Sequence, residues 1–165
     1  MRISSKKDLF EEIRTKLIKQ GFSIVAQDDK QPWGGSILID EAQAAAFAEA
    51  YFTSVDPHTF STKLPIRPKI LVVEPGKAIT WQYHERRAEL WRVIIGEVGV
   101  KVNDSDEDPD VQVKNCGDYL FLEPKKRHRL VGLKNWGIIA QIWQHIDEEN
   151  PSDDEDVVRI NGLNV

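Results

Sequence analysis

The chain has 165 residues, of which 41% are hydrophobic and 30% are charged, and its formal net charge at pH 7 is −5. This length suits a single domain with a full hydrophobic core. An acidic surface of mixed charge argues against nucleic-acid binding, and no apolar run is long enough to cross a membrane.

The beginning of the chain is predicted to form a helix. Residues 6–19 carry apolar side chains on one side of an amphipathic helix. Ser4 or Ser5 can cap the start of this helix with a hydroxyl oxygen, and Gly21 is expected to end it.

A short strand and a second helix are expected next. Residues 36–39 predict the strand, and Asp40 follows as a candidate N-cap with Gln43 three residues later, as in a capping box. The alanine-rich residues 41–52 then predict a helix. Residues 54–68 contain three prolines and are expected to form a loop.

From Lys69 onward the sequence changes to short β runs separated by turn residues. Eight such runs at regular spacing are typical of a small antiparallel barrel or jelly roll. The predicted strands cover residues 69–74, 78–84, 89–95, 97–102, 111–114, 118–122, 128–133 and 137–145. The predicted fold class is therefore mainly β, with an N-terminal α-helical extension.

We expect one domain over residues 1–165, in three parts. Residues 1–68 form an extension of helices and loop packed on the barrel, and residues 69–146 form the barrel core. Residues 147–165 form an acidic C-terminal segment, in which positions 147–156 hold seven acidic residues and no Lys or Arg.

The segment between Gly76 and Gly96 contains three candidate metal ligands. Gln82 and His84 are two residues apart, so on one strand their side chains point to the same face. Glu89 opens the next apolar run, and a short return between the two strands places its carboxylate opposite Gln82 and His84. An amide oxygen, an imidazole and a carboxylate that face one interior are suited to a divalent metal ion.

A fourth candidate ligand, His128, follows Gly117 after a strand and a turn. The two segments together resemble the cupin signature, G-x5-H-x-H-x3,4-E-x6-G followed by G-x5-P-x-G-x2-H-x3-N. Gln82 replaces the first His of the first motif. In the second motif, the Pro, the turn Gly and the final Asn are replaced by Glu123, Lys125 and Gly132.

The Gln-x-His order resembles the phosphomannose isomerases. Residues 71–92 resemble the isomerase domain of the type II enzymes, the mannose-6-phosphate isomerase/mannose-1-phosphate guanylyltransferase family, through L-V-V-x-P-G, Q-x-H and R-A-E-x-W. Residues 32–34 and 128–130 resemble its P-W-G and H-R-L segments, and residues 154–160 resemble its E-D-D-I-V-R segment. The resemblance covers residues 31–160 and implies a metal site made of Gln82, His84, Glu89 and His128.

The general base of such an enzyme is expected among three residues. Lys69 matches a lysine in the first barrel strand of the family and shares strand parity with Leu71 and Val73. Glu123, beside the turn that precedes the second motif's histidine, and Glu85 are the rival candidates.

Basic residues near the motifs are candidates for substrate binding. Arg86 either contacts the substrate or pairs with the adjacent Glu85. A group of cations lies on both sides of His128 in the sequence: Lys125, Lys126, Arg127 and Arg129. These residues either form a cationic lip that binds a phosphate, or form an exposed basic turn that balances the charge of the acidic C-terminal segment.

These features predict a metal-dependent aldose–ketose isomerase of the phosphomannose isomerase type, which acts on a sugar or sugar phosphate through an enediolate. The expected cofactor is a divalent metal ion: zinc, manganese, iron, cobalt or nickel. The alternatives are a non-catalytic sugar-binding cupin and an isomerase of another sugar, such as a heptose phosphate, lyxose or mannose. A metal-dependent oxygenase is a third possibility.

The cellular context is predicted from what the sequence lacks. It contains one cysteine, Cys116, and its start has no apolar region of a secretory signal, so the cytoplasm is the expected compartment. The expected partner is a small-molecule sugar or sugar phosphate, with no nucleic acid and no membrane. We also expect a homodimer, because small barrels often pair through their strand edges.

Overall fold

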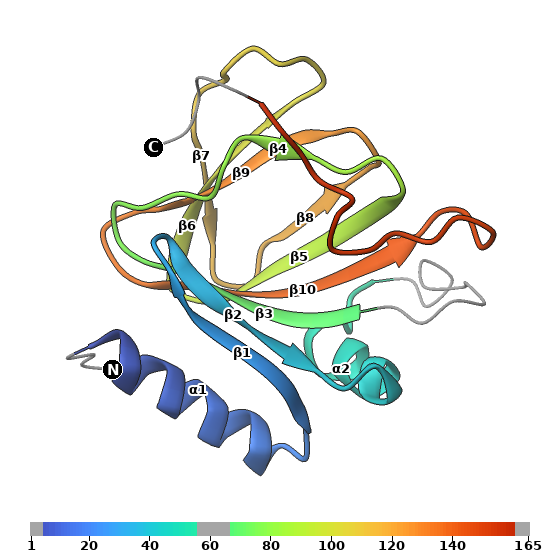
Figure 1. Ribbon diagram of the computed structural model, residues 1–165. Coiled ribbons are helices and arrows are strands. Elements are labelled where there is room, and N and C mark those ends of the chain that lie inside the picture. Colours follow the sequence, from blue (N-terminus) through green and yellow to red (C-terminus); the bar gives the residue numbers. More distant parts are fainter. Residues whose placement is uncertain (1–4, 56–66, 161–165) are drawn as a thin grey trace.

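The computed structural model describes residues 5–55 and 67–160, which form two antiparallel sheets facing one another and helices at one side (Figure 1). The first sheet has the strand order β1-β2-β3-β10-β5-β8 and the second has the order β11-β4-β9-β6-β7. The strands are β1 (Ile24–Gln31), β2 (Gly34–Ile39), β3 (Arg67–Val73), β4 (Gln82–Tyr83), β5 (Arg87–Ile95), β6 (Glu97–Asn103), β7 (Gln112–Asn115), β8 (Tyr119–Leu122), β9 (Arg127–Gly132), β10 (Gly137–His145) and β11 (Val158–Arg159).

The first helix, α1 (Lys6–Lys19), has the bounds that the sequence predicts. The hydroxyl oxygen of Ser5 accepts a hydrogen bond from the backbone N–H of Asp8, which satisfies one of the unpaired donors at the helix start. Gly21 follows the helix with a φ of 95°, a left-handed conformation that glycine adopts without steric cost.

The second helix begins as a 3-10 turn (Glu41–Gln43) and continues as α2 (Ala44–Tyr51). The Asp40 carboxylate caps it, as predicted, by accepting from the N–H of Ala42. The predicted capping-box role of Gln43 is wrong, because its side chain accepts from the Ser23 N–H and donates to the Gly21 carbonyl. Gln43 therefore ties the second helix to the segment that follows α1.

The first sheet is covered on both faces. On its outer face, Ile70 and Val72 of β3 pack in one cluster with residues of α1 and α2. On its inner face, Leu71 and Val73 pack in a second cluster with residues of the opposite sheet, such as Leu130. Because both faces are buried, β3 and β10 are almost continuously apolar, and the inner cluster forms the barrel interior.

The structure differs from the predicted strands at three places, one of which is β11, a strand in the segment that was predicted only as acidic. β1 is not predicted, because its sequence IVAQDDKQ lacks alternating apolar residues; it is an edge strand that pairs with β2. β4 covers two residues instead of the predicted 78–84. The preceding backbone meets β9 irregularly, through an isolated bridge between Ala78 and Val131.

Two further predictions concern loops and membranes. Most of the predicted loop at 54–68 lies outside the described residues. Within residues 5–55 and 67–160, no helix is both long and apolar enough to cross a membrane.

Candidate metal centre

The four predicted ligands come from neighbouring strands of the barrel. Gln82 on β4 and His128 on β9 are directly paired across the antiparallel ladder, so their side chains share one face of that sheet. His84 follows β4 at once, and Glu89 lies on β5 in the facing sheet. The short return between β4 and β5 thus places Glu89 opposite the strand that carries Gln82 and leads to His84.

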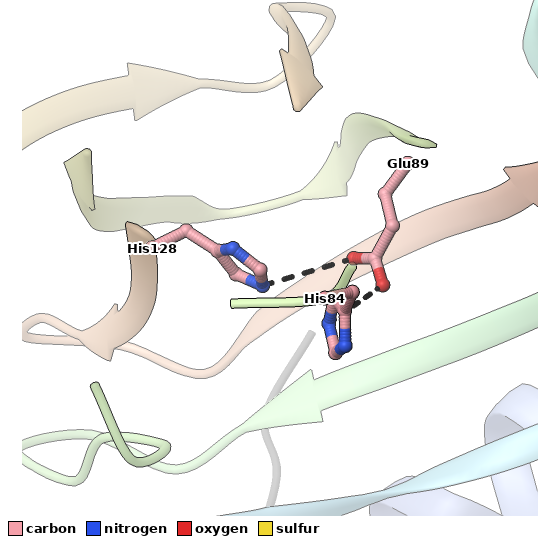
Figure 2. A group of neighbouring side chains, drawn as sticks. All are labelled: His84, Glu89 and His128. Carbon is pink, nitrogen blue, oxygen red and sulfur yellow. Dashed lines mark ion pairs between the residues drawn. The ribbon is translucent and has the colours of Figure 1, made fainter. Parts of the chain in front are cut away.

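Three of these side chains converge in the interior, as Figure 2 shows. One candidate ligand atom from each of His84, Glu89 and His128 lies within 4.8 Å of the others. His84 Nε2 lies 3.1 Å from Glu89 Oε2, and His128 Nε2 lies 4.0 Å from Glu89 Oε1. All three residues are at most 4% exposed to solvent.

Both histidines are oriented by main-chain carbonyls. His84 Nδ1 lies 2.6 Å from the Asp156 carbonyl oxygen, and His128 Nδ1 lies 2.9 Å from the Lys126 carbonyl oxygen. A carbonyl oxygen only accepts hydrogen bonds, so each Nδ1 carries a proton. The Nε2 atom of each ring is thereby left facing Glu89.

Glu89 is held as a carboxylate by donors on two sides. Trp91 Nε1 donates to Oε1 at 2.9 Å, and Arg87 Nε donates to Oε2 at 3.0 Å. Burial alone would raise the pKa of Glu89, but the attraction of His84 and Arg87 outweighs it and holds that pKa well below the usual value. The cluster therefore contains one fixed negative charge.

His128 is held in its neutral form. Burial lowers the pKa of its imidazole to about 4, although the nearby Glu89 carboxylate acts in the opposite direction. Its Nε2 atom is buried and has no hydrogen-bond partner among the described residues. Such a buried, unpaired lone pair is costly in a protein interior unless something binds it.

The donor set fits a divalent metal ion. Neutral imidazole nitrogens and one carboxylate are ligands that zinc, manganese, iron, cobalt and nickel accept, and the amide oxygen of Gln82 can add a fourth. The Gln82 amide oxygen already accepts from the Thr80 hydroxyl at 3.0 Å, which restrains its orientation. The unpaired Nε2 of His128 is the observation that fits a metal best.

Lys69, the predicted base, lies on β3 and shares strand parity with Leu71 and Val73, which pack in the barrel interior. Burial lowers the pKa of its ammonium group, and the Glu89 carboxylate opposes that shift. Lys69 is therefore within electrostatic reach of the cluster. Glu123 and Glu85, the rival candidates, are both exposed.

The predicted substrate-binding residues are not brought to the cluster. Arg127 and Arg129 lie on the face of β9 opposite to His128, by strand alternation. Arg127 donates to Asp106 at 2.8 Å, and the buried Arg129 donates to the Ile79 carbonyl at 2.7 Å.

Lys125 and Arg86, the other two predicted substrate-binding residues, also lie away from the cluster. The Lys125 side chain is exposed, in the turn between β8 and β9. The Arg86 guanidinium donates to Asn150, to the Pro151 carbonyl and to Asp153 of the C-terminal segment, and no ion pair with Glu85 is present among the described residues.

Two residues of the site were not predicted. Arg87 donates to Glu89, its Nη2 lies 3.2 Å from His84 Nε2, and its guanidinium stacks on the Trp143 ring at 3.9 Å. Its place two residues before Glu89, on the same face of β5, is the one signal in the sequence that could have marked it. Asp156 holds the loop that carries His84, and only its place in the 154–160 resemblance marks it in the sequence.

Comparisons with solved structures agree with a cupin-type barrel. The chain resembles a mutant oxalate decarboxylase from Bacillus subtilis, with a TM-score of 0.58, 10% identity, and coverage of 82% of this chain and 30% of that one. It also resembles the oxalate decarboxylase of Lactobacillus farciminis, determined as a formate complex (TM-score 0.56, 12% identity, 82% and 33% coverage). The third is the capsular polysaccharide assembling protein CapF of Staphylococcus aureus (TM-score 0.52, 11% identity, 87% and 34% coverage).

The chain spans about a third of the length of these proteins, so the likeness concerns the fold alone. No curated protein matches the sequence. The family model described as "Mannose-6-phosphate isomerase C-terminal" matches residues 40–162, which include all four predicted ligands and most of the barrel. The chain therefore belongs to the mannose-6-phosphate isomerase C-terminal family.

Proposed function

We propose that the protein is a metal-dependent aldose–ketose isomerase that acts on a sugar or sugar phosphate through an enediolate. The observation that carries the proposal is the buried cluster of His84, Glu89 and His128, with Lys69 in the same barrel interior. The match to the mannose-6-phosphate isomerase C-terminal family supports the choice of an isomerase. A bound metal ion would act as a Lewis acid on the sugar carbonyl.

The chain's own residues have separate tasks in this reaction. Neutral His128 and the Glu89 carboxylate would hold a divalent ion and would leave it with a net positive charge. Isomerisation needs a base that moves a proton between C1 and C2. Burial lowers the pKa of Lys69. A larger fraction of this side chain is therefore the neutral amine, which can accept the proton, than in an exposed lysine.

Arg87 is suited to stabilise the negative charge that forms on the sugar during the reaction. Its guanidinium is fixed between Glu89 and the face of Trp143, and it keeps a permanent positive charge close to the cluster. A charge held in this position can stabilise the negative oxygen that forms as the carbonyl is converted to an enediolate.

The basic turn before β9 is the candidate site for a substrate phosphate. Lys126 pairs with Asp104, and Arg127 pairs with Asp106, so two of the four cations of the predicted lip are already matched by acidic residues. This pairing reduces the positive charge that the turn offers to a phosphate. Each free sugar must therefore be compared with its phosphate.

The proposal is tested by incubating the metal-loaded protein with sugars in deuterated water. We expect deuterium at C1 or C2 and a ketose product, measured by NMR, for at least one substrate. The panel is mannose, glucose, lyxose, their phosphates and a heptose phosphate, each with zinc, manganese, cobalt, nickel and iron. Lys69→Met should lower the rate by about 10²–10⁴-fold, as expected for loss of a general base.

Cys116→Ala serves as the control, because Cys116 is exposed and lies on the turn between β7 and β8, away from the cluster. Its rate should match the wild type. Binding of sugars by the wild-type protein, with neither exchange nor product across the whole panel, would show instead a non-catalytic sugar-binding protein.

A further inference from the structure

The C-terminal segment lies against the loop that carries His84 (Figure 1, red). β11 pairs with β4 through Val158 opposite Tyr83 and Arg159 opposite Gln82. Beyond it, the Ile160 N–H donates to the Trp81 carbonyl at 2.8 Å. Residues 158–160 are thus fixed to the strand that leads into the first metal-ligand motif.

Asp156 is the residue through which this segment reaches the metal-ligand loop. Its carboxylate accepts from the backbone N–H groups of Glu85 and Arg86, at 2.9 and 3.0 Å, and from the Ser152 hydroxyl at 2.6 Å. Its own carbonyl oxygen accepts from His84 Nδ1 at 2.6 Å. Asp156 is 6% exposed, so water competes little for these hydrogen bonds.

We propose that Asp156 is a positioning residue of the metal centre, a role that rests on the metal site of the proposed function. Its carboxylate fixes the backbone at 85–86, and this places the Asp156 carbonyl where it holds the His84 ring. The ring then keeps its proton on Nδ1 and presents Nε2 to Glu89. A ligand held in advance loses less rotational freedom when it binds a metal.

The remainder of the segment supports this arrangement. The Arg86 side chain donates to Asn150, to the Pro151 carbonyl and to Asp153, and the Ser152 N–H donates to His145 Nδ1 at 2.8 Å. These contacts hold residues 150–153 in place, from which Ser152 donates to Asp156. Arg86 therefore anchors the segment that positions His84.

The inference is tested by titrating the metal-free protein with zinc. Asp156→Ala should raise the dissociation constant for zinc by about 10–100-fold, the usual effect of losing an outer partner of a metal-binding histidine. Asp156→Asn retains one acceptor oxygen and a similar size, so it should fall between Asp156→Ala and the wild type. Asp154→Ala is the matched control: it removes the same charge from the same segment at a side chain that is 85% exposed and takes no part in these contacts, and should stay within about two-fold.

A second measurement separates positioning from loss of stability. With saturating cobalt, the visible absorption spectrum of Asp156→Asn should differ from that of the wild type, because the His84 ring is no longer held in one orientation. Zinc binding within two-fold of the wild type and an unchanged cobalt spectrum in this variant would overturn the inference while leaving the proposed function intact. A wild-type protein that binds neither metal overturns both.

Discussion

At the scale of single residues, the two histidines of the cluster follow one rule. In each ring, Nδ1–H donates a hydrogen bond to a main-chain carbonyl, and Nε2 faces Glu89. Main-chain acceptors keep this tautomer at any pH at which the neutral ring persists, because a carbonyl does not ionise. The orientation in which the two rings would meet a metal ion is therefore fixed by the backbone.

The pKa of His128 gives a prediction for the metal-free protein. It is about 4 in the folded state and 6.5 ordinarily, so the unfolded chain binds this proton more readily between those values. Stability therefore falls as the pH falls through this range, by about 1.4 kcal/mol per pH unit, or about 2 kcal/mol at about pH 5.

Urea unfolding of chelator-treated protein at about pH 7.5 and about pH 5 measures this loss. The control is His128→Gln, because glutamine does not titrate. Between the two pH values, the free energy of unfolding of this variant should fall by about 2 kcal/mol less than that of the wild type. An equal pH dependence in the two proteins would refute the assignment of the effect to His128.

The candidate ligands can be predicted from the sequence more readily than the residues that hold them in place. Gln82, His84, Glu89 and His128 are recognisable from their spacing, because the alternation of strands fixes which side chains share a face. Asp156 contacts His84 across 72 positions of sequence, and no local pattern specifies such a contact. Arg87 was missed for another reason: an arginine two residues from a glutamate has many ordinary roles.

At the scale of elements, the turn between β8 and β9 departs from the cupin signature, and this departure has a conformational cost. Lys125 stands where the cupin signature has glycine, and its φ is 68°, in the left-handed region. The Lys125 N–H donates to the His84 carbonyl at 2.6 Å, so the turn also holds the loop of the first motif. The signature glycine thus has a conformational explanation here.

This conformation predicts that Lys125→Gly stabilises the protein. A left-handed residue with a Cβ costs about 1–2 kcal/mol, and the extra flexibility of glycine in the unfolded chain cancels part of the gain. We expect a net increase of about 0.5–1 kcal/mol in the free energy of unfolding, measured in urea. Lys126→Gly, the control at the next position, should not stabilise; a Lys125→Gly variant less stable than the wild type would contradict the explanation.

Elements buried on both faces were easier to predict than edges. β3 and β10 appear as apolar runs because the helices cover one face and the barrel interior the other. β1 is half polar, and β11 has only two residues, both exposed. What defines these two strands is their pairing with β2 and β4, which the local sequence does not encode.

At the scale of the whole molecule, the acidic segments neutralise the basic ones around the barrel. Asp104 and Asp106 pair with Lys126 and Arg127 on β9 and the turn before it. Asp153 of the C-terminal segment pairs with Arg86. Each exposed pair contributes little to stability, but the pairs at Lys126 and Arg127 reduce the positive charge of the cationic lip that the sequence predicted as one alternative.

The cupin-type barrel itself was predicted, because regular short strands and two spaced motifs restrict the chain to few architectures. The N-terminal part was predicted less fully. It was expected to pack on the barrel as helices and loop, whereas β1 and β2 also extend the first sheet beside β3. Gly34 makes that approach possible, since a Cβ there would lie 1.8 Å from the Val72 carbonyl oxygen.

The central claim is that His84, Glu89 and His128 form a metal centre, and metal content tests it most directly. Elemental analysis of the protein after loading and dialysis should give about one divalent ion per chain. His84→Ala and His128→Ala should each lose the ion and remain folded by circular dichroism, while Cys116→Ala, at an exposed possible ligand outside the cluster, should keep it. A full complement of metal in both histidine variants would contradict the account.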